Sequence, residues 1–346
     1  MKLTKKLTAI TLAAVMSLSL AVGCSSAPAD STGSSAAPSS GETSSTPVEK
    51  ATIRVGALKG PTGLGMLKLM DDSDKGAAAN DYEFTIVASP DDMVAKVSSG
   101  EVDCAAVPPN LAATLYQKTE GKIQLANINT LGILSILTNG MEVNSIEDLK
   151  GKTIYSTGQG AVPEYALNYI LEKNGLEVGK DITVEYKSEH SELATLMISG
   201  EVQLAVLPEP FVTQVTAKNA DVKIAMNLTD EWDKATNKES VLCMGGLIVN
   251  KEFAEKNKDA FNQFLDEYKA SVEYVNSNPA DAAKISEEKD IMAAAVAEKA
   301  IPNCNIVYID GSEMKEKVSG FLKVLYDANA KSVGGSLPDE DFYYTK

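Results

Sequence analysis

Two short glycine-rich stretches of this 346-residue chain have the composition of loops that hold a small molecule. They cover residues 60–65 (GPTGLG) and 157–160 (TGQG), and each separates an apolar run from a helical pattern. Glycine allows close backbone approach, and free N–H groups at a helix N-terminus attract anions or carbonyl oxygens. A purely structural strand-to-helix turn is the alternative for each loop. We predict ligand contacts from Pro61, Thr62, Gly63, Thr157, Gln159 and Gly160.

Five further residues are candidates for the same site. Pro108 and Asn110 follow one apolar run and Glu209 follows another, where the ends of parallel strands face a crevice. Capping of the next helix is the alternative role for Glu209. Tyr165 and Met244 are candidate apolar walls of the site, with packing in the core as the alternative.

The chain has few residues suited to catalysis. His190 is the only histidine and stands in a polar stretch predicted to be a loop, so histidine-based triads and histidine metal clusters are excluded. Residues 158–160 resemble part of a dinucleotide fingerprint, but Pro163 replaces its third glycine. We therefore expect no enzyme, no metal site and no cofactor.

The charged residues bear on the kind of ligand. Arg54 is the only arginine and lies inside a predicted strand, so a bidentate arginine clamp on an anion is nearly unavailable. A strongly anionic ligand would have to rely on helix N-termini or on Lys59. A neutral or weakly charged solute, such as a pyrimidine-like heterocycle or an amide, fits better. The net charge of −16 argues against binding to nucleic acid or to anionic lipid.

An internal repeat predicts how these residues are positioned. Residues 99–108 (SGEVDCAAVP) recur as residues 199–208 (SGEVQLAVLP), with six of the ten positions identical. Each copy predicts a helix that ends at glycine, a buried strand and a proline that stops it. Matching strand and loop patterns extend upstream of both copies. The sequence thus predicts an α/β fold of two similar lobes with a ligand cleft between them and two hinge crossings.

The repeat also sets the predicted domain boundaries. Lobe I covers residues 51–135 plus 247–346, and lobe II covers residues 136–246. The crossings are expected near residues 134–138 and 243–247, where Gly245 and Gly246 could absorb hinge rotation. Helical patterns after residue 250 are expected to pack on lobe I.

The N-terminal segment has the pattern of an export signal. Residues 1–23 have a lysine-rich start and an apolar core, and residues 21–24 (AVGC) form a lipobox-like site that makes Cys24 the predicted lipidation point. An ordinary signal peptide is the alternative. Residues 24–50, rich in serine, alanine and proline, predict a flexible tether. The other cysteines, Cys104, Cys243 and Cys304, are expected to be buried thiols, with one disulfide left open.

Together these motifs resemble the type II periplasmic-binding-protein superfamily, in the branch that serves nitrate, taurine, alkanesulfonate and thiamine-precursor importers. The residues that carry the resemblance are 21–24, 52–63, 99–109, 147–167 and 199–211, and Glu209 matches a Glu-Pro of that family. The resemblance implies a monomeric, membrane-anchored, extracytoplasmic lipoprotein that delivers a small solute to an ABC permease and its ATPase. A solute sensor for a membrane partner and an exported enzyme on the same fold are the alternatives.

Overall fold

The computed structural model describes residues 50–346. The predicted signal peptide (1–23), the lipidation point Cys24 and all of the tether except residue 50 lie outside this range. Within residues 50–346, no helix combines the length and apolar character needed to cross a membrane.

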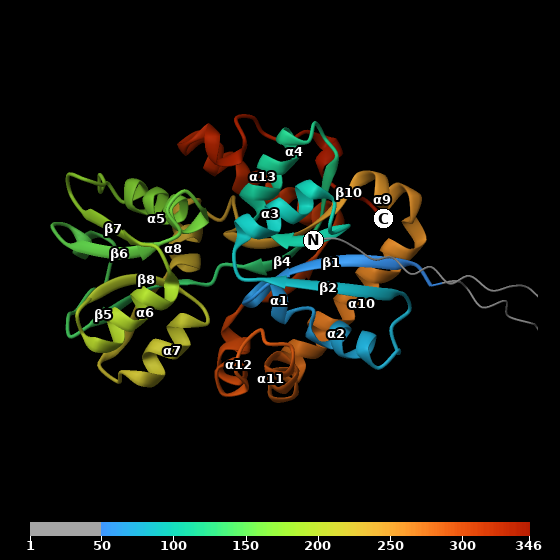
Figure 1. The fold of residues 1–346 in the computed structure, drawn as a ribbon. Coiled ribbons are helices and arrows are strands. Elements are labelled where there is room, and N and C mark those ends of the chain that lie inside the picture. The colour runs from blue at the N-terminus through green and yellow to red at the C-terminus, as the bar shows by residue number, and fades with distance from the viewer. Residues whose placement is uncertain (1–49) are drawn as a thin grey trace, which may run out of the picture. The chain divides into compact units, whose positions relative to one another are not determined.

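Two mixed β-sheets, each covered by helices, form the two lobes of the described chain (Figure 1). We call the first sheet with its helices lobe I and the second with its helices lobe II. In spatial order, the first sheet contains β11 (Ile306–Ile309), β4 (Ile123–Leu131), β10 (Cys243–Asn250), β3 (Cys104–Val107), β1 (Thr52–Leu58) and β2 (Asp81–Val87). The second contains β7 (Thr183–Lys187), β6 (Thr153–Thr157), β8 (Leu204–Pro208), β5 (Leu134–Asn139) and β9 (Val222–Asn227). The predicted α/β fold of two similar lobes is confirmed.

Helices join and cover the strands. Residues 50–200 contribute α1 (Pro61–Leu64), α2 (Leu67–Asp74), α3 (Pro90–Ser99), α4 (Pro109–Lys118), α5 (Val162–Lys173) and α6 (His190–Ser199). Residues 201–346 contribute α7 (Phe211–Lys218), α8 (Leu228–Ala235), α9 (Lys251–Lys256), α10 (Lys258–Ser277), α11 (Pro279–Glu288), α12 (Ala294–Ala300) and α13 (Gly311–Ala328). Short 3-10 turns include η2 (Ile301–Asn303) and η3 (Ala330–Val333).

The two sheets repeat one strand arrangement. In lobe I, β1 pairs in parallel with β2 and β3, while β10 runs antiparallel between β3 and β4. In lobe II, β6 pairs in parallel with β7 and β8, while β5 runs antiparallel between β8 and β9. As the repeated sequence predicts, α3 ends at Gly100 and α6 at Gly200, with φ of 73° and 82°. These left-handed conformations strongly favour glycine.

The structure corrects the predicted hinge. The chain leaves lobe I between β4 and β5, through Gly132 and Ile133, and returns between α8 and β10, through residues 236–242. Gly245 and Gly246 instead lie inside β10, which is paired with β4, and Gly246 also pairs with β3. They are needed for close packing: a Cβ atom at Gly246 would lie 2.8 Å from the carbonyl oxygen of Asn127. The predicted boundaries at 135/136 and 246/247 fall inside β5 and β10 and remain a proposal.

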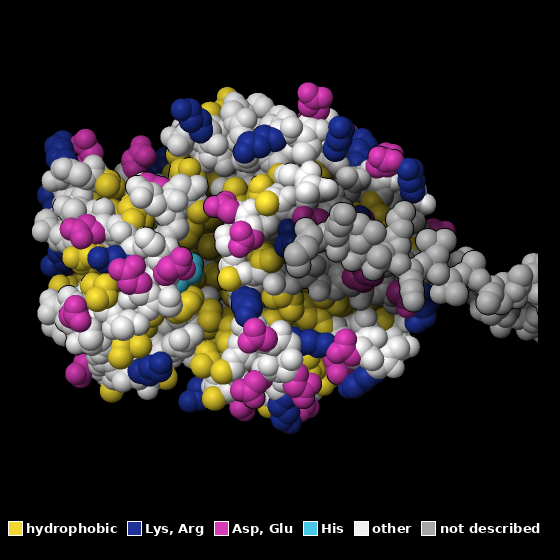
Figure 2. Space-filling model, in the orientation of Figure 1, with side chains coloured by type: hydrophobic (Ala, Val, Ile, Leu, Met, Phe, Trp, Pro, Cys, Tyr) yellow, Lys and Arg dark blue, Asp and Glu magenta, His cyan; other side chains and the backbone are white. Residues whose placement is uncertain are grey.

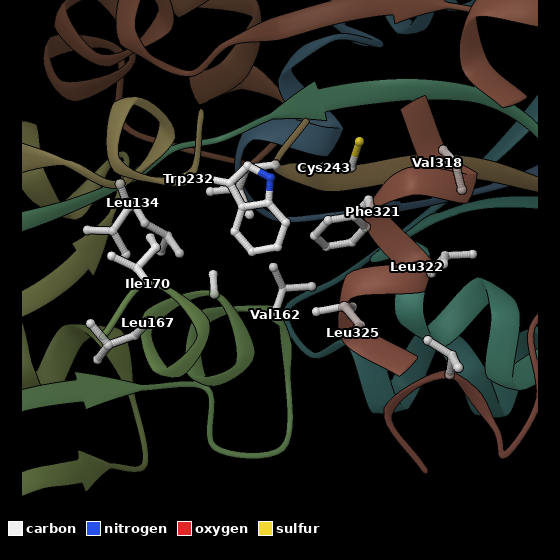
Figure 3. Close-up of a cluster of buried hydrophobic side chains, with 14 of the residues drawn as sticks. Leu134, Val162, Leu167, Ile170, Trp232, Cys243, Val318, Phe321, Leu322 and Leu325 are labelled. Atoms are coloured by element: carbon white, nitrogen blue, oxygen red, sulfur yellow. The ribbon is translucent and has the colours of Figure 1, made fainter. Parts of the chain in front are cut away.

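One hydrophobic core joins the two lobes (Figure 3). Trp232 of α8 is fully buried, and its ring centroid lies 5.6 Å from that of Phe321 on α13 and 5.1 Å from that of Tyr169 on α5. Leu322 and Leu325 continue the α13 side of this core. The predicted apolar faces of α10 and α13 are buried, but α13 contacts lobe II as well as lobe I.

The three cysteines of the described range are buried and free. Burial raises the pKa of the Cys243 thiol to about 12, so this thiol stays protonated at neutral pH. The disulfide left open by the sequence is not formed in the structure, and the expectation of buried thiols is met.

Candidate functional site

The strand ends that carry the predicted site residues lead into four helices. In lobe I, β1 leads into α1 and β3 into α4; in lobe II, β6 leads into α5 and β8 into α7. Figure 2 shows a hollow between the two lobes. Crevices at the carboxyl ends of parallel strands are the usual ligand sites of α/β sheets.

A cavity of about 330 Å³ opens between the lobes on the side of α7. Its volume lies at the low end of the range for small-molecule sites, which is about 300–1,000 Å³. Lobe I provides the segment before β11, and lobe II provides α7 and parts of β5 and β9, with the first crossing between them. The lining residues are Gly132, Ile133, Ser135, Glu209, Val212, Thr213, Thr216, Ile224, Asn227, Pro302, Asn303 and Asn305.

Glu209 is the only charged residue among those lining residues. It is 7% exposed, and its Oε2 accepts a hydrogen bond from the backbone N–H of Thr213 at 3.1 Å. Burial raises the pKa of the Glu209 carboxyl, and the charge of Glu209 also contributes to the raised pKa of Cys304 in lobe I. The carboxylate therefore lies close to both lobes. A buried carboxylate with no cationic partner among residues 50–346 is suited to accept N–H donors from a ligand.

The first predicted loop forms α1 and packs tightly on lobe I. Thr62 is 9% exposed, and a Cβ atom at Gly245 would lie 2.6 Å from its Cγ2 and 2.4 Å from Asn129 Oδ1. A Cβ atom at Gly63 would lie 2.4 Å from the carbonyl oxygen of Leu58. Gly63 is thus required by the turn itself, whatever the loop binds. Pro61 begins the helix.

The second predicted loop is more open. Gln159 and Gly160 are exposed, whereas Thr157 is 1% exposed and ends β6. The backbone N–H of Gly160 donates to Glu164 Oε2 at 2.5 Å, so this N–H group already has an acceptor. The side chain of Gln159 remains the free polar group of the loop.

Asn110 and the two apolar candidates pack against their own surroundings. Asn110 is 1% exposed, and its Nδ2 donates to the carbonyl oxygen of Ser332 on η3 at 3.5 Å. Pro108 is the residue before α4. Tyr165 and Met244 are half-buried and pack against the core shared by the lobes. Among the predicted residues, Glu209 lines the inter-lobe cavity, and the other ten lie outside its lining, so their ligand contacts stay predictions.

Sequence reasoning missed His190. This residue begins α6, and its Nδ1 lies 2.5 Å from Thr157 Oγ1. Its ring packs at 5.4 Å from that of Phe211, which begins α7. The repeat contained the signal, because His190 stands one hundred residues after Pro90, the first residue of α3. Asn303 and Asn305 of the cavity had no signal in the sequence.

Comparison with known proteins identifies the family of this chain. The model of the family described as NMT1/THI5 like matches residues 81–282, which is more than half of the sequence. The chain belongs to the NMT1/THI5-like family. A search of curated proteins found no match to this NMT1/THI5-like chain.

Solved structures agree with that family. An ABC transporter protein from Parabacteroides distasonis is 26% identical with a TM-score of 0.71, and the match covers 85% of this chain and 99% of that one. The periplasmic aliphatic sulphonate binding protein SsuA from Escherichia coli is 14% identical with a TM-score of 0.68, covering 85% and 92%. The periplasmic nitrate-binding protein NrtA from Synechocystis PCC 6803 is 15% identical with a TM-score of 0.55, covering 82% and 84%. The similarity to SsuA and NrtA shows that this chain shares their fold. The predicted resemblance to the periplasmic-binding-protein superfamily is confirmed.

Proposed function

We propose that this NMT1/THI5-like protein is the extracytoplasmic solute-binding component of an ABC importer. It captures a small molecule between its lobes and delivers it to a permease and its ATPase. The observation that carries this proposal is the cavity whose walls come from both lobes. A solute that contacts both walls binds the closed arrangement more tightly than an open one, and this difference in affinity favours closure. The substrate-binding proteins among its structural neighbours support the same role.

Membrane attachment is part of the proposal and rests on residues 1–24 alone. A lipid on Cys24 would hold the chain, as a monomer, at the outer face of the membrane. Cys24→Ala should abolish acylation and release the protein to the medium, which cell fractionation measures. Continued membrane attachment of this variant would contradict the lipoprotein assignment without affecting the solute-binding role.

For the ligand, we propose a neutral or weakly charged solute that donates N–H hydrogen bonds, such as an aminopyrimidine. The carboxylate of Glu209 would repel an anion, and no lysine or arginine is among the residues that line the cavity. The two cations first considered for an anion are occupied: Arg54 pairs with Asp103, and Lys59 lies 2.7 Å from Asp290. These contacts support a donor-bearing ligand over nitrate or a sulfonate.

Mass spectrometry of small molecules released from the purified protein tests the function. A thermal-shift screen of pyrimidines, amino acids, sulfonates and nitrate then ranks the classes. A pyrimidine or similar donor should raise the melting temperature of the native protein and raise it less in Glu209→Gln. Stabilisation by nitrate alone would overturn the ligand class, whereas failure of every solute to bind would overturn the proposed function.

The crevice loops are tested separately. Thr62→Ala and Gln159→Ala should each weaken binding by about 0.5–1.5 kcal/mol, the usual contribution of one hydrogen bond, with little change in the unliganded melting temperature. A variant that loses stability and binds normally would assign its loop a structural role. Distances between labels at residues 73 and 219, on different lobes, should shorten when the solute binds.

A further inference from the structure

The first crossing between the lobes is held by hydrogen bonds from both sides. In lobe I, the carbonyl oxygen of Asn305 accepts from the backbone N–H of Leu131 at 3.1 Å, which continues the pairing of β11 with β4. In lobe II, the backbone N–H of Glu209 donates to the carbonyl oxygen of Ile133 at 2.9 Å, which continues the pairing of β5 with β8. Gly132 is the one residue between these two bonds.

The side chain of Asn305 bonds the residue in between. Its Nδ2 donates to the carbonyl oxygen of Gly132 at 2.6 Å, so one residue of lobe I bonds two consecutive residues of the crossing. A carbonyl oxygen only accepts hydrogen bonds, and the amide nitrogen is therefore the end of Asn305 that faces it. The backbone of Asn305 is left-handed, with φ of 43°, a conformation in which asparagine is enriched over most residues that carry a side chain.

These bonds leave one residue of the crossing free to rotate. The carbonyl group of Gly132 lies in the peptide plane between residues 132 and 133, and this plane is bonded to lobe I. The carbonyl group of Ile133 lies in the next peptide plane, which is bonded to lobe II. The two planes meet at the Cα atom of Ile133. A turn of one lobe against the other can therefore be absorbed by φ and ψ of Ile133 without breaking either bond.

The second crossing passes next to the same point. A Cβ atom at Gly132 would overlap Thr229 Oγ1, near the start of α8, and would lie 3.1 Å from Leu242 Cδ2 in the segment that returns to lobe I. Gly132 has no room for a side chain because the two crossings are in contact there. Since both crossings must turn together, the rotation axis has to run close to both, and Ile133 lies at that point.

We propose that Ile133 is the pivot of the first crossing and that Asn305 is the positioning residue that confines lobe rotation to it. Without the Asn305 amide, the nearest bond from lobe I is the one at Leu131, and Gly132 becomes a second rotating residue with the wide φ/ψ range of glycine. Gly132, Ile133, Glu209 and Asn305 all line the inter-lobe cavity, so a solute in that cavity lies against the pivot. The effect of the pivot on binding rests on the proposed solute-binding function, whereas its position does not.

Distances between spin labels at residues 73 and 219 test the pivot without any ligand. Asn305→Gly keeps the left-handed backbone and removes the amide, and Asn305→Asp keeps the side-chain shape and removes the donor. Both variants should broaden the distribution of label distances in the unliganded protein, with little change in melting temperature. Asn303→Asp is the matched control on the same cavity wall. Asn303 Nδ2 bonds the carbonyl oxygen of Lys299 within lobe I, so this variant should keep the wild-type distribution.

Binding of 4-aminopyrimidine measures what this confinement contributes. A solute that needs the closed arrangement binds in proportion to the fraction of protein that adopts it. Both Asn305 variants should therefore lower the affinity by roughly 2- to 10-fold, the range that corresponds to one hydrogen bond. A fall in affinity with an unchanged distribution of label distances would make Asn305 a direct contact of the solute and would overturn its role at the pivot.

The remaining outcomes separate the two proposals. Label distances that stay unchanged in both Asn305 variants would overturn the pivot and leave the solute-binding function standing. Equal broadening in Asn303→Asp and Asn305→Asp would also overturn it, because the cause would then be the added charge and not the lost bond to Gly132. If the distances broaden as expected but neither 4-aminopyrimidine nor any other solute binds, the proposed function fails and the pivot stands.

Discussion

The two copies of the repeated segment share a turn and differ at both ends. In lobe I, Ser99 Oγ donates to Glu101 Oε1 at 2.9 Å, and in lobe II, Ser199 Oγ donates to Glu201 Oε1 at 3.0 Å. Both turns end their helix at a left-handed glycine. Both lobes share the backbone of this turn. The residues that differ between the two copies therefore indicate what each lobe contributes.

Just before the strand of each copy, lobe I has a half-buried ion pair where lobe II has an uncharged residue. Asp103 accepts hydrogen bonds from the backbone N, Nε and Nη2 of Arg54 at 2.8, 3.0 and 2.5 Å, and Arg54 Nη1 donates to the carbonyl oxygen of Gly100 at 2.7 Å. The position equivalent to Asp103 is Gln203.

At the N-terminal ends of α3 and α6, the titratable residue is in lobe II and the uncharged residues are in lobe I. Ser89 caps α3 by accepting from the N–H of Asp91, and Pro90 begins the helix. In lobe II, His190 begins α6 and bonds Thr157 instead. Lobe I therefore uses its polar residues to hold its sheet together, and lobe II places titratable groups at the crevice.

The largest effect is expected where the lobes join. Trp232→Ala removes the central ring of the shared core and should cost about 3–5 kcal/mol of unfolding free energy. It should also separate the unfolding of the two lobes into two transitions in urea, followed by circular dichroism. Ile224→Ala, an exposed apolar side chain of the same lobe, is the control and should change little. A loss below about 1 kcal/mol would mean that the lobes are stable independently.

The ion pair of lobe I should give the next largest effect. Asp103→Ala leaves the guanidinium and the backbone N–H of Arg54 without their acceptor and should cost about 1.5–3 kcal/mol in urea unfolding. The matched change in lobe II, Gln203→Ala, should cost less than about 0.5 kcal/mol. Equal losses at the two positions would contradict the division of roles between the lobes.

Glu209→Gln should increase stability. The gain should be smaller than the losses expected for Trp232→Ala and Asp103→Ala. Because burial raises the pKa of Glu209, the folded protein holds this proton more tightly than the unfolded chain. Its stabilising contribution is present below the unfolded pKa and is lost as pH rises through the folded pKa. The variant should thus melt higher than wild type at pH 7, with less difference at pH 4, while Glu201→Gln on the surface shows neither change.

The smallest effects are expected at the shared turn. Ser99→Ala and Ser199→Ala each remove an exposed hydroxyl that bonds a neighbouring glutamate, so each should cost less than about 0.5 kcal/mol. The two losses should be equal within error in the same urea experiment. A clear difference would show that the turns are not equivalent.

The sequence predicted the parts of the fold that the internal repeat encodes. Two sheets, the glycine ends of α3 and α6 and the strands that follow them were all readable from one pattern. Long-range contacts were not: Asn110 bonds Ser332, 222 residues away, and no local pattern signals that pairing. The glycine pair in β10 was misassigned because glycine allows both rotation and close packing, and a Cβ atom at Gly245 would lie 2.4 Å from Asn129 Oδ1.

The candidate site was predicted only in outline. Glu209 was found because the repeat placed it at a strand end, and the structure puts it on the inter-lobe cavity. His190 was assigned to a loop because its neighbours are polar, although the same repeat would have put it at the start of a helix. Three further cavity residues, Pro302, Asn303 and Asn305, come from the segment before β11, which has no counterpart in the repeat.

The position of β10 sets an order of assembly for the two lobes. Lobe II takes all its strands from one continuous stretch, β5 to β9, whereas the sheet of lobe I needs β10 between β3 and β4. β4 ends at Leu131, and β10 begins at Cys243. The sheet of lobe I therefore cannot form completely until residue 243 and the rest of β10 have left the ribosome. During synthesis the later lobe can complete its sheet first. The sheet of the earlier lobe stays incomplete meanwhile, because β4 has neither of its neighbours, β10 and β11, and the inner edge of β3 is unpaired. The second lobe to be made is thus the first that can fold.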